Sequence, residues 1–124
     1  MTFLAFEAYL RLIELDVCLK RGGFAALHKR VRGQSVRADF ISSKPAENIC
    51  SAVDMACIWY WREVLCLQRS AATACLLKRY GVAAQLVIGT RQTPFKAHAW
   101  VEVDGRVVND KPYIGETYAV VERC

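Results

Sequence analysis

Apolar residues in the first part of the chain recur every three or four positions, which is the spacing of an amphipathic helix. From Phe3 to about Arg21 this pattern predicts a first helix, and Gly22 and Gly23 follow its last basic turn as an end signal. A second basic helix is expected from Phe24 to Val31. The two helices would form a helical hairpin at the start of the chain.

The middle of the chain combines a polar connection with two further helices. Gly33 to Pro45 mixes polar residues with glycine and proline, which is typical of a surface loop. Helical spacing returns from about Glu47 to Tyr60. Leu67 to Tyr80 is rich in good helix formers and is followed by Gly81, a common helix end. We therefore expect Cys66 at the N-terminus of this last helix.

The C-terminal part of the chain shows the composition and alternation of β-strands. Strands are expected from Ala83 to Thr90, from Ala97 to Val103 and from Arg106 to Asp110, with Asp104-Gly105 as the turn between the last two. Tyr118 to Val121 would complete a small antiparallel sheet. The order of elements predicts an α+β fold.

Length and composition favour one compact domain. The chain has 124 residues, of which 54% are apolar, which is enough to fill a single core. We predict one domain over residues 1–124, with a mainly helical part at 1–62 and the candidate catalytic helix and sheet at 63–124. Charged residues interrupt the apolar stretch from Phe3 to Leu19, so neither a membrane span nor a signal peptide is expected. The expected location is cytoplasmic.

The net charge of +5 is distributed unevenly. The stretch from Val17 to Ala38 contains no acidic residue and six basic ones, which are Lys20, Arg21, Lys29, Arg30, Arg32 and Arg37. We interpret this stretch as a solvated helix face, with docking of an acidic peptide or partner protein as the alternative. No aromatic stacking pattern or nucleic-acid motif accompanies the charge, so nucleic-acid binding is not expected.

Six cysteines occur without a signal peptide and beside a normal apolar content, so we interpret them as reduced thiols. No Cys-x-x-Cys pair is present and only two histidines are available, so we expect no metal site and no cofactor. Cys50 and Cys57 lie seven apart on a predicted helix and are interpreted as small buried apolar residues.

Cys66 is the best candidate for a nucleophile among the six thiols. A cysteine at a helix N-terminus lies at the positive end of the helix dipole and next to free backbone N–H groups, and both favour a thiolate. The N–H groups around Cys66 and Leu67 could also bind the oxyanion that forms when a thiolate attacks a carbonyl. Gln68 is a possible side-chain donor to the same oxyanion.

His98 is the better of two candidate bases. His28 lies among basic residues, which supply no carboxylate to orient its ring, and is interpreted as a helix-face residue. His98 lies on a predicted strand whose hairpin partner ends in Asn109 and Asp110, so a carboxylate or an amide can lie beside its ring.

The register of this hairpin decides which of the two residues faces His98. A two-residue Asp104-Gly105 loop pairs Val103 with Arg106 and favours Asn109 as the orienting group. A three-residue loop shifts the pairing by one position, so that His98 faces Asp110 directly. We predict the three-residue, bulged register and Asp110 as the orienting residue.

A cysteine that opens a helix, followed by a strand with histidine and a strand with aspartate, is also the order found in transglutaminase-like and papain-like cores. The predicted α+β fold therefore has N-terminal helices and such a core, with Cys66 packed on a small antiparallel sheet. Three motifs make the match more specific. They are Cys-Leu-x-Arg-Ser from Cys66, Ala-His-Ala-Trp-Val-Glu-x-x-Gly around His98, and the Asn-Asp pair that ends at Asp110.

These motifs resemble the leader peptidase of lasso-peptide biosynthesis, a member of the transglutaminase-like superfamily. The resemblance covers roughly the second half of the chain and, more loosely, Ser51 to Asp54. It implies a cysteine peptidase with a Cys66, His98 and Asp110 triad that cuts a lasso precursor at its leader–core junction. Trp100 also matches a family position and joins Leu67, Gln68 and Asn109 as a candidate for oxyanion or substrate binding.

The resemblance also implies partners. A separate small protein would recognise the leader, and an asparagine-synthetase-like lasso cyclase would close the ring on the freed core. The chain would correspond to the split form of the peptidase, without a fused recognition domain. The alternatives are a transglutaminase-type acyltransferase that forms an amide with the same triad, and a non-catalytic module that binds the precursor.

Overall fold

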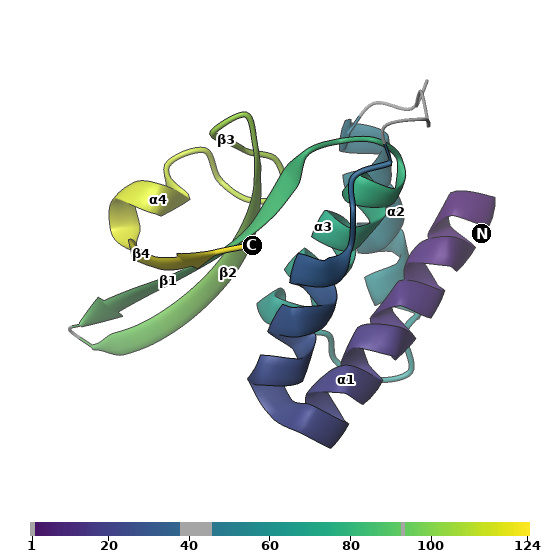
Figure 1. Ribbon diagram of the computed structural model, residues 1–124, viewed down its shortest axis with the longest axis horizontal. Helices are drawn as coiled ribbons and strands as arrows, with labels where there is room; N and C mark the ends of the chain where they lie inside the picture. The colour runs from purple at the N-terminus through teal and green to yellow at the C-terminus, as the bar shows by residue number, and fades with distance from the viewer. Residues whose placement is uncertain (1, 38–45, 93) are drawn as a thin grey trace.

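The computed structural model describes residues 2–37, 46–92 and 94–124. Its elements are α1 (Phe3–Gly33), α2 (Ala46–Trp59), α3 (Cys66–Arg79), β1 (Ala84–Gln92), β2 (Phe95–Val103), β3 (Arg106–Val107), α4 (Ile114–Thr117) and β4 (Ala119–Arg123). The strands form one antiparallel sheet in the order β3-β2-β1-β4 (Figure 1). The predicted α+β fold is confirmed, and much of the predicted loop from Gly33 to Pro45 lies outside the described residues.

The α1 helix turns back on itself, as the predicted helical hairpin requires. The break lies at Gly23, whose φ of 68° and ψ of −161° are not helical and favour glycine. Beyond this break the second arm runs back beside the first (Figure 1). Arg30 Nη2 lies 3.2 Å from Glu14 Oε1, so an ion pair joins the two arms.

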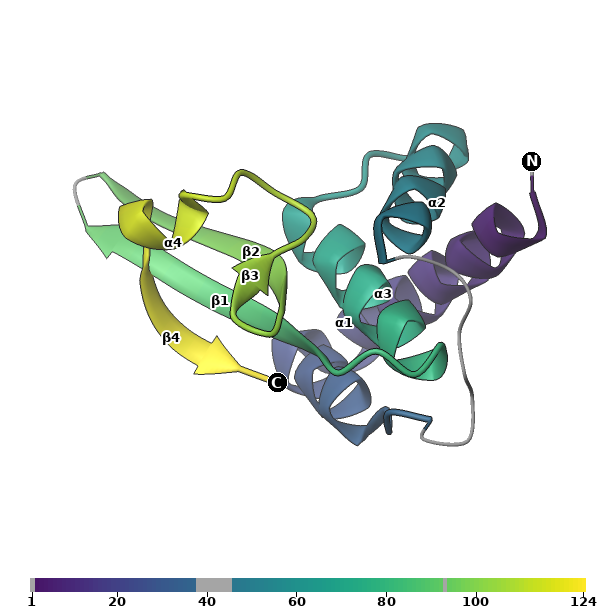
Figure 2. The same ribbon diagram turned by 90° about the horizontal axis from the view of Figure 1, so that it is seen from above.

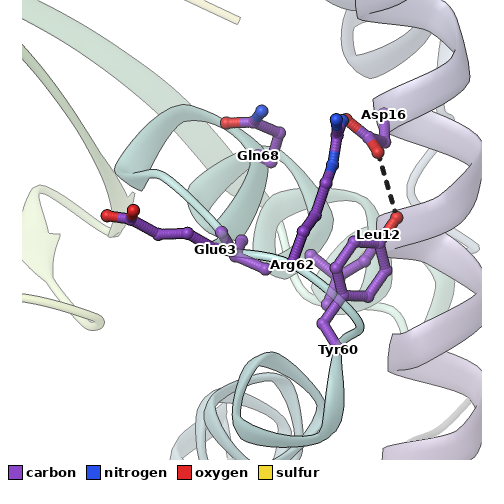
Figure 3. Close-up of a pocket in the computed structure, with 7 residues that line it drawn as sticks. Leu12, Asp16, Tyr60, Arg62, Glu63 and Gln68 are labelled. Carbon is purple, nitrogen blue, oxygen red and sulfur yellow. Dashed lines mark hydrogen bonds and ion pairs between the residues drawn. The ribbon is translucent and has the colours of Figure 1, made fainter.

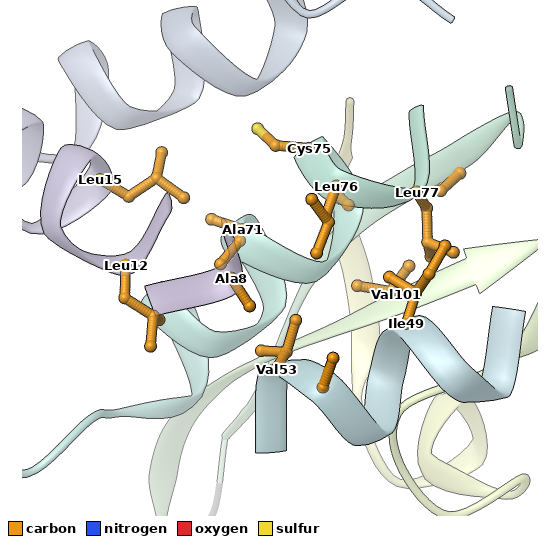
Figure 4. Close-up of a cluster of buried hydrophobic side chains, with 14 of the residues drawn as sticks. Ala8, Leu12, Leu15, Ile49, Val53, Ala71, Cys75, Leu76, Leu77 and Val101 are labelled. Carbon is orange, nitrogen blue, oxygen red and sulfur yellow. The ribbon is translucent and has the colours of Figure 1, made fainter. Parts of the chain in front are cut away.

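The main core lies between one face of the sheet and the layer of α1, α2 and α3. On α3, Leu76 and Leu77 are fully buried, and Val101 of β2 meets them from the sheet (Figure 4). Burying a leucine of this kind contributes about 1.5–3 kcal/mol. The core therefore fixes α3 against β1 and β2, while these two strands extend beyond the helices (Figure 2).

A second, smaller cluster covers the opposite face of the sheet. It consists of Val87, Trp100, Ile114 and Tyr118, and it includes the short helix α4, which the sequence pattern did not predict. Gly89 makes this packing possible, because a Cβ at that position would lie 2.7 Å from the Trp100 ring and 2.8 Å from Tyr118 Cβ. The glycine therefore lets two aromatic residues close over β1.

The hairpin register differs from the prediction. Val103 pairs with Arg106 across a two-residue loop, in which Asp104 and Gly105 have φ values of 51° and 75°. Two successive positive φ values are characteristic of a tight type I′ turn, so the predicted bulged loop is wrong. The strand β3 also ends at Val107 instead of continuing to Asp110. Ladder register therefore does not determine where Asp110 lies.

The outer face of the first arm of α1 is apolar although it is exposed. Its large residues recur every three or four positions and are Phe3, Phe6, Leu10, Ile13 and Val17.

None of the described helices is both long and apolar enough to cross a membrane.

Candidate active site

Cys66 is the first residue of α3, as predicted. The preceding residue, Leu65, has the extended φ and ψ of an N-cap (−84° and 167°), but its apolar side chain makes no capping hydrogen bond. The first N–H that bonds back along this helix is that of Arg69, 3.1 Å from Leu65 O. The helix therefore begins without the side-chain cap that Thr2 gives α1, where Ala5 N donates to Thr2 Oγ1 at 3.1 Å.

His98 lies on β2 and is held by a carboxylate. Its Nε2 lies 2.6 Å from Asp110 Oδ2, a distance typical of a strong charge-assisted hydrogen bond. The second carboxylate oxygen, Oδ1, accepts from the backbone N–H of Lys111 at 2.7 Å. With Nε2 donating to Asp110, the other ring nitrogen of His98, Nδ1, is the one that can accept a proton.

These contacts change the acidity of Asp110. Burial alone would raise the pKa of Asp110, but the hydrogen bonds from His98 and from the Lys111 N–H lower it. The positive charges of His98 and Arg69 act in the same direction, so the pKa of Asp110 lies below its ordinary value of 3.8. The carboxylate is therefore ionised at neutral pH and can stabilise a charged imidazole.

Two aromatic rings restrict the position of the His98 ring. Tyr118 stacks on it with centroids 5.4 Å apart and an interplanar angle of 24°, and Trp100 does so at 6.1 Å and 29°. Trp100 is fully buried, and its Nε1 donates to Glu102 Oε2 at 3.0 Å. The buried Trp100 ring therefore packs beside His98.

The hydrogen bonds of Asn109 go to partners other than His98, although the tight turn favoured Asn109 as the group that orients that ring. Its Oδ1 accepts from Val101 N at 2.8 Å, and its Nδ2 donates to Ser70 Oγ at 3.0 Å. Ser70 in turn donates to Ala99 O at 3.0 Å. Ser70 lies one turn after Cys66, so these bonds hold the first turns of α3 next to the segments that carry His98 and Asp110.

Comparisons with known proteins identify the family of this chain. The family model of the transglutaminase-like superfamily matches residues 9–123. The chain belongs to this superfamily. It is also similar to the microcin J25-processing protein McjB of Escherichia coli, with 43% identity over 56 residues. That alignment covers 45% of this chain but only 27% of the relative's length. No solved structure gives a significant match.

In this transglutaminase-like chain a small pocket lies beside the start of α3 (Figure 3). Its lining includes Gln68, whose Oε1 is buried and has no hydrogen-bond partner among the described residues. Asp16 of α1 also lines it, accepts from Tyr60 Oη at 3.2 Å and pairs with Arg62. These contacts tie the segment that leads into Cys66 to α1.

Four other thiols of this chain lie in surroundings that raise their pKa values. Burial raises the pKa of Cys50 and of Cys57 to about 11, and burial also raises the pKa values of Cys75 and Cys124. All six cysteines are free. The predicted packing role is confirmed for Cys50, which is buried, and Cys57 lies partly buried against the core. A raised thiol pKa means less thiolate at neutral pH.

His28 has a carboxylate neighbour that its sequence context did not reveal. Its Nε2 lies 3.6 Å from Glu122 Oε2 of β4, and its ring packs against Phe24 at 5.8 Å. Among residues 2–37, 46–92 and 94–124, no three His, Cys, Asp or Glu side chains form a group that could hold a metal ion. His98, by contrast, lies on β2, a strand that contacts α3.

Ser70 belongs to the hydrogen-bond network of the candidate site, although the sequence analysis included it only as part of a motif. The available signal was a hydroxyl in an apolar run, because buried residues from Ala71 to Leu77 follow it directly. A polar side chain at such a position needs a hydrogen-bond partner from another element.

Proposed function

We propose that this chain is a cysteine peptidase that removes the leader from a ribosomally made lasso-peptide precursor. Cys66 would be the nucleophile, His98 the base and Asp110 the residue that orients it. The observation that carries the proposal is the 2.6 Å bond between His98 and Asp110, together with the bond that joins the neighbouring Asn109 to Ser70 of α3. Superfamily membership and the similarity to a protein named for processing microcin J25 support it.

The proposed reaction is acyl transfer to water. His98 Nδ1 accepts the proton of Cys66, and the thiolate attacks the carbonyl carbon of the leader–core peptide bond. The imidazolium then gives its proton to the leaving amine of the core, and the leader stays on sulfur as a thioester. Water, deprotonated by His98, attacks this thioester and releases the leader with a free carboxylate. Asp110 stabilises the imidazolium in both stages.

The uncapped start of α3 supplies the remaining element of this mechanism. A helix begins with N–H groups that have no acceptor within the helix. Because Leu65 offers no side-chain oxygen, the N–H groups of Cys66, Leu67 and Gln68 are available to the oxyanion of the tetrahedral intermediate. A donor of this kind typically contributes about 10²–10³ in rate.

The proposal includes partners as well as a substrate. A separate leader-recognition protein would present the precursor, and an asparagine-synthetase-like lasso cyclase would use the freed core amine. The reaction would take place in the cytoplasm and needs no cofactor. The alignment covers only 27% of the relative's length, so these partners are proposed here and do not follow from the alignment.

Incubation with candidate precursor peptides, with and without the recognition protein, tests the proposal by mass spectrometry. We expect free leader and free core from the wild-type chain and neither from Cys66→Ala. A cross-linked or amidated product without free core would instead support the amide-forming alternative. Leader removal at an equal rate by Cys66→Ala would contradict the catalytic assignment.

A further inference from the structure

A buried hydroxyl connects the three segments that carry the candidate triad. Ser70 is fully buried, at 0% exposure, so its hydroxyl depends on partners within the protein. It donates to Ala99 O and accepts from Asn109 Nδ2, both at 3.0 Å. Asn109 Oδ1 then accepts from Val101 N at 2.8 Å, which links the network back to β2.

Each member of this network lies close in sequence to one member of the triad. Ser70 is four residues after Cys66, which is about one helical turn. Ala99 directly follows His98, and Asn109 directly precedes Asp110. The β3 ladder ends at Val107, so the Asn109 side chain takes over where backbone pairing stops. The network is therefore suited to fix the distance between α3 and the His98–Asp110 pair.

We propose that Ser70 is a positioning residue that sets the geometry between Cys66 and the His98–Asp110 pair. The inference rests on the proposed function, because it assumes that these three residues react together. Ser70 itself touches no reacting atom. Its loss would leave Asn109 Nδ2 without its acceptor and would free the Asp110 loop to shift relative to α3. A displacement of about 1 Å in such a site can cost on the order of 100-fold in rate.

Thr73 provides a matched control on the same helix. It is also buried, at 1% exposure, but its Oγ1 donates at 2.8 Å to Arg69 O within α3 and not to the sheet. Ser70→Ala and Thr73→Val each remove one buried hydroxyl. We expect Ser70→Ala to lower kcat for leader removal by about 10- to 100-fold with little change in KM. Thr73→Val should stay within about twofold of wild type, because its bond does not reach β2 or Asp110.

A second readout needs no substrate and is measured on the folded protein. The rate at which iodoacetamide alkylates Cys66 is followed from pH 5 to 9 by peptide mapping, in folded protein. A nearby imidazolium stabilises the thiolate, so a shift of His98 slows this reaction at neutral pH. We expect about a fivefold or larger decrease in Ser70→Ala, with an altered pH profile, and the wild-type profile in Thr73→Val. Thermal unfolding of both variants checks that they are equally folded.

Asn109→Ala tests whether the two side chains act as one unit. If they do, the double variant Ser70→Ala/Asn109→Ala alkylates no more slowly than the slower single variant. Identical Cys66 profiles in wild type and Ser70→Ala would overturn the positioning role, whether or not the chain cleaves a precursor. Absence of cleavage by wild type, together with the Ser70→Ala shift, would overturn the proposed function and leave the positioning role supported.

Discussion

Helix α2 and the start of α3 carry the same functional group, a thiol, in two environments. On α2, burial raises the pKa of Cys50 and of Cys57 to about 11, so both thiols stay protonated at neutral pH. Cys66 instead opens α3, behind an N-cap that makes no side-chain bond and one turn before the network that holds His98. Burial is what keeps the two α2 thiols protonated, whereas the role proposed for Cys66 depends on its place at a helix N-terminus.

Replacing Cys66 and Cys57 in turn should give the largest difference in activity between the two environments. We expect Cys66→Ala to lower leader removal by on the order of 10⁴-fold or more, because no other group replaces the nucleophile. Cys57→Ala should keep the wild-type rate and lose only some packing stability. Single-turnover assays with a cognate precursor measure both. Loss of activity in Cys57→Ala, with Cys66→Ala active, would reverse the assignment.

Asp110→Asn tests the second half of the α3 environment. The amide preserves the shape of the side chain but cannot stabilise the charged imidazole of His98, so we expect kcat to fall by about 10²- to 10⁴-fold. The free energy of unfolding should fall only by the contribution of the Asp110–His98 bond, because the side chain is not part of either apolar cluster. Steady-state kinetics together with thermal unfolding check this. Unchanged kcat in the folded variant would show that His98 needs no carboxylate.

Leu65→Ser tests whether the free N–H groups at the start of α3 bind the oxyanion. Leu65 is exposed and already has N-cap dihedrals, so a serine there can accept from the N–H of Leu67 or Gln68. We expect the free energy of unfolding to rise by about 1 kcal/mol. Turnover should fall by about tenfold, because the cap competes with the oxyanion for these donors. Leu65→Ala serves as the control, and a faster or unchanged Leu65→Ser enzyme would contradict this use of the N–H groups.

We expect the smallest effect from lowering the pH, which weakens the bond between Asp110 and His98. The pKa of Asp110 is depressed, so its bond to His98 contributes stability in full above the ordinary carboxyl value of 3.8. This contribution is lost as pH falls below that value and through the lower pKa of the folded state. Urea midpoints measured from pH 6 down to pH 2.5 should therefore decrease more steeply for wild type than for Asp110→Asn. Parallel curves would indicate that this bond does not stabilise the fold.

Local signals predicted most of the helical part of the fold. The Gly22-Gly23 pair marked the break in α1, where Gly23 adopts a positive φ. Sequence spacing placed the start of α3 at Cys66. The helix α4 was missed because four residues from Ile114 are too few to show helical periodicity. Its one buried residue contacts the sheet through a tertiary cluster that no local pattern contains.

The candidate site shows where sequence reasoning reached its limit. The pairing of His98 with Asp110 is present, but the bulged register invoked to produce it is wrong. The prediction assumed that the third strand continued to Asp110, whereas the chain leaves the ladder after Val107. Side-chain bonds of Asn109 then place the loop, and bonds between elements distant in sequence leave no periodic signal. For the same reason Ser70 could not be assigned a role from spacing alone.

A leader peptide whose C-terminal carboxyl is replaced by a vinyl sulfone tests the central claim most directly. This electrophile reacts with a thiolate held where the cleaved bond would lie, and peptide mapping identifies the labelled residue. We expect one label per chain on Cys66, with labelling strongly slowed in His98→Ala and unchanged in Cys57→Ala. Labelling of another cysteine, or labelling of Cys66 at the same rate without His98, would contradict it.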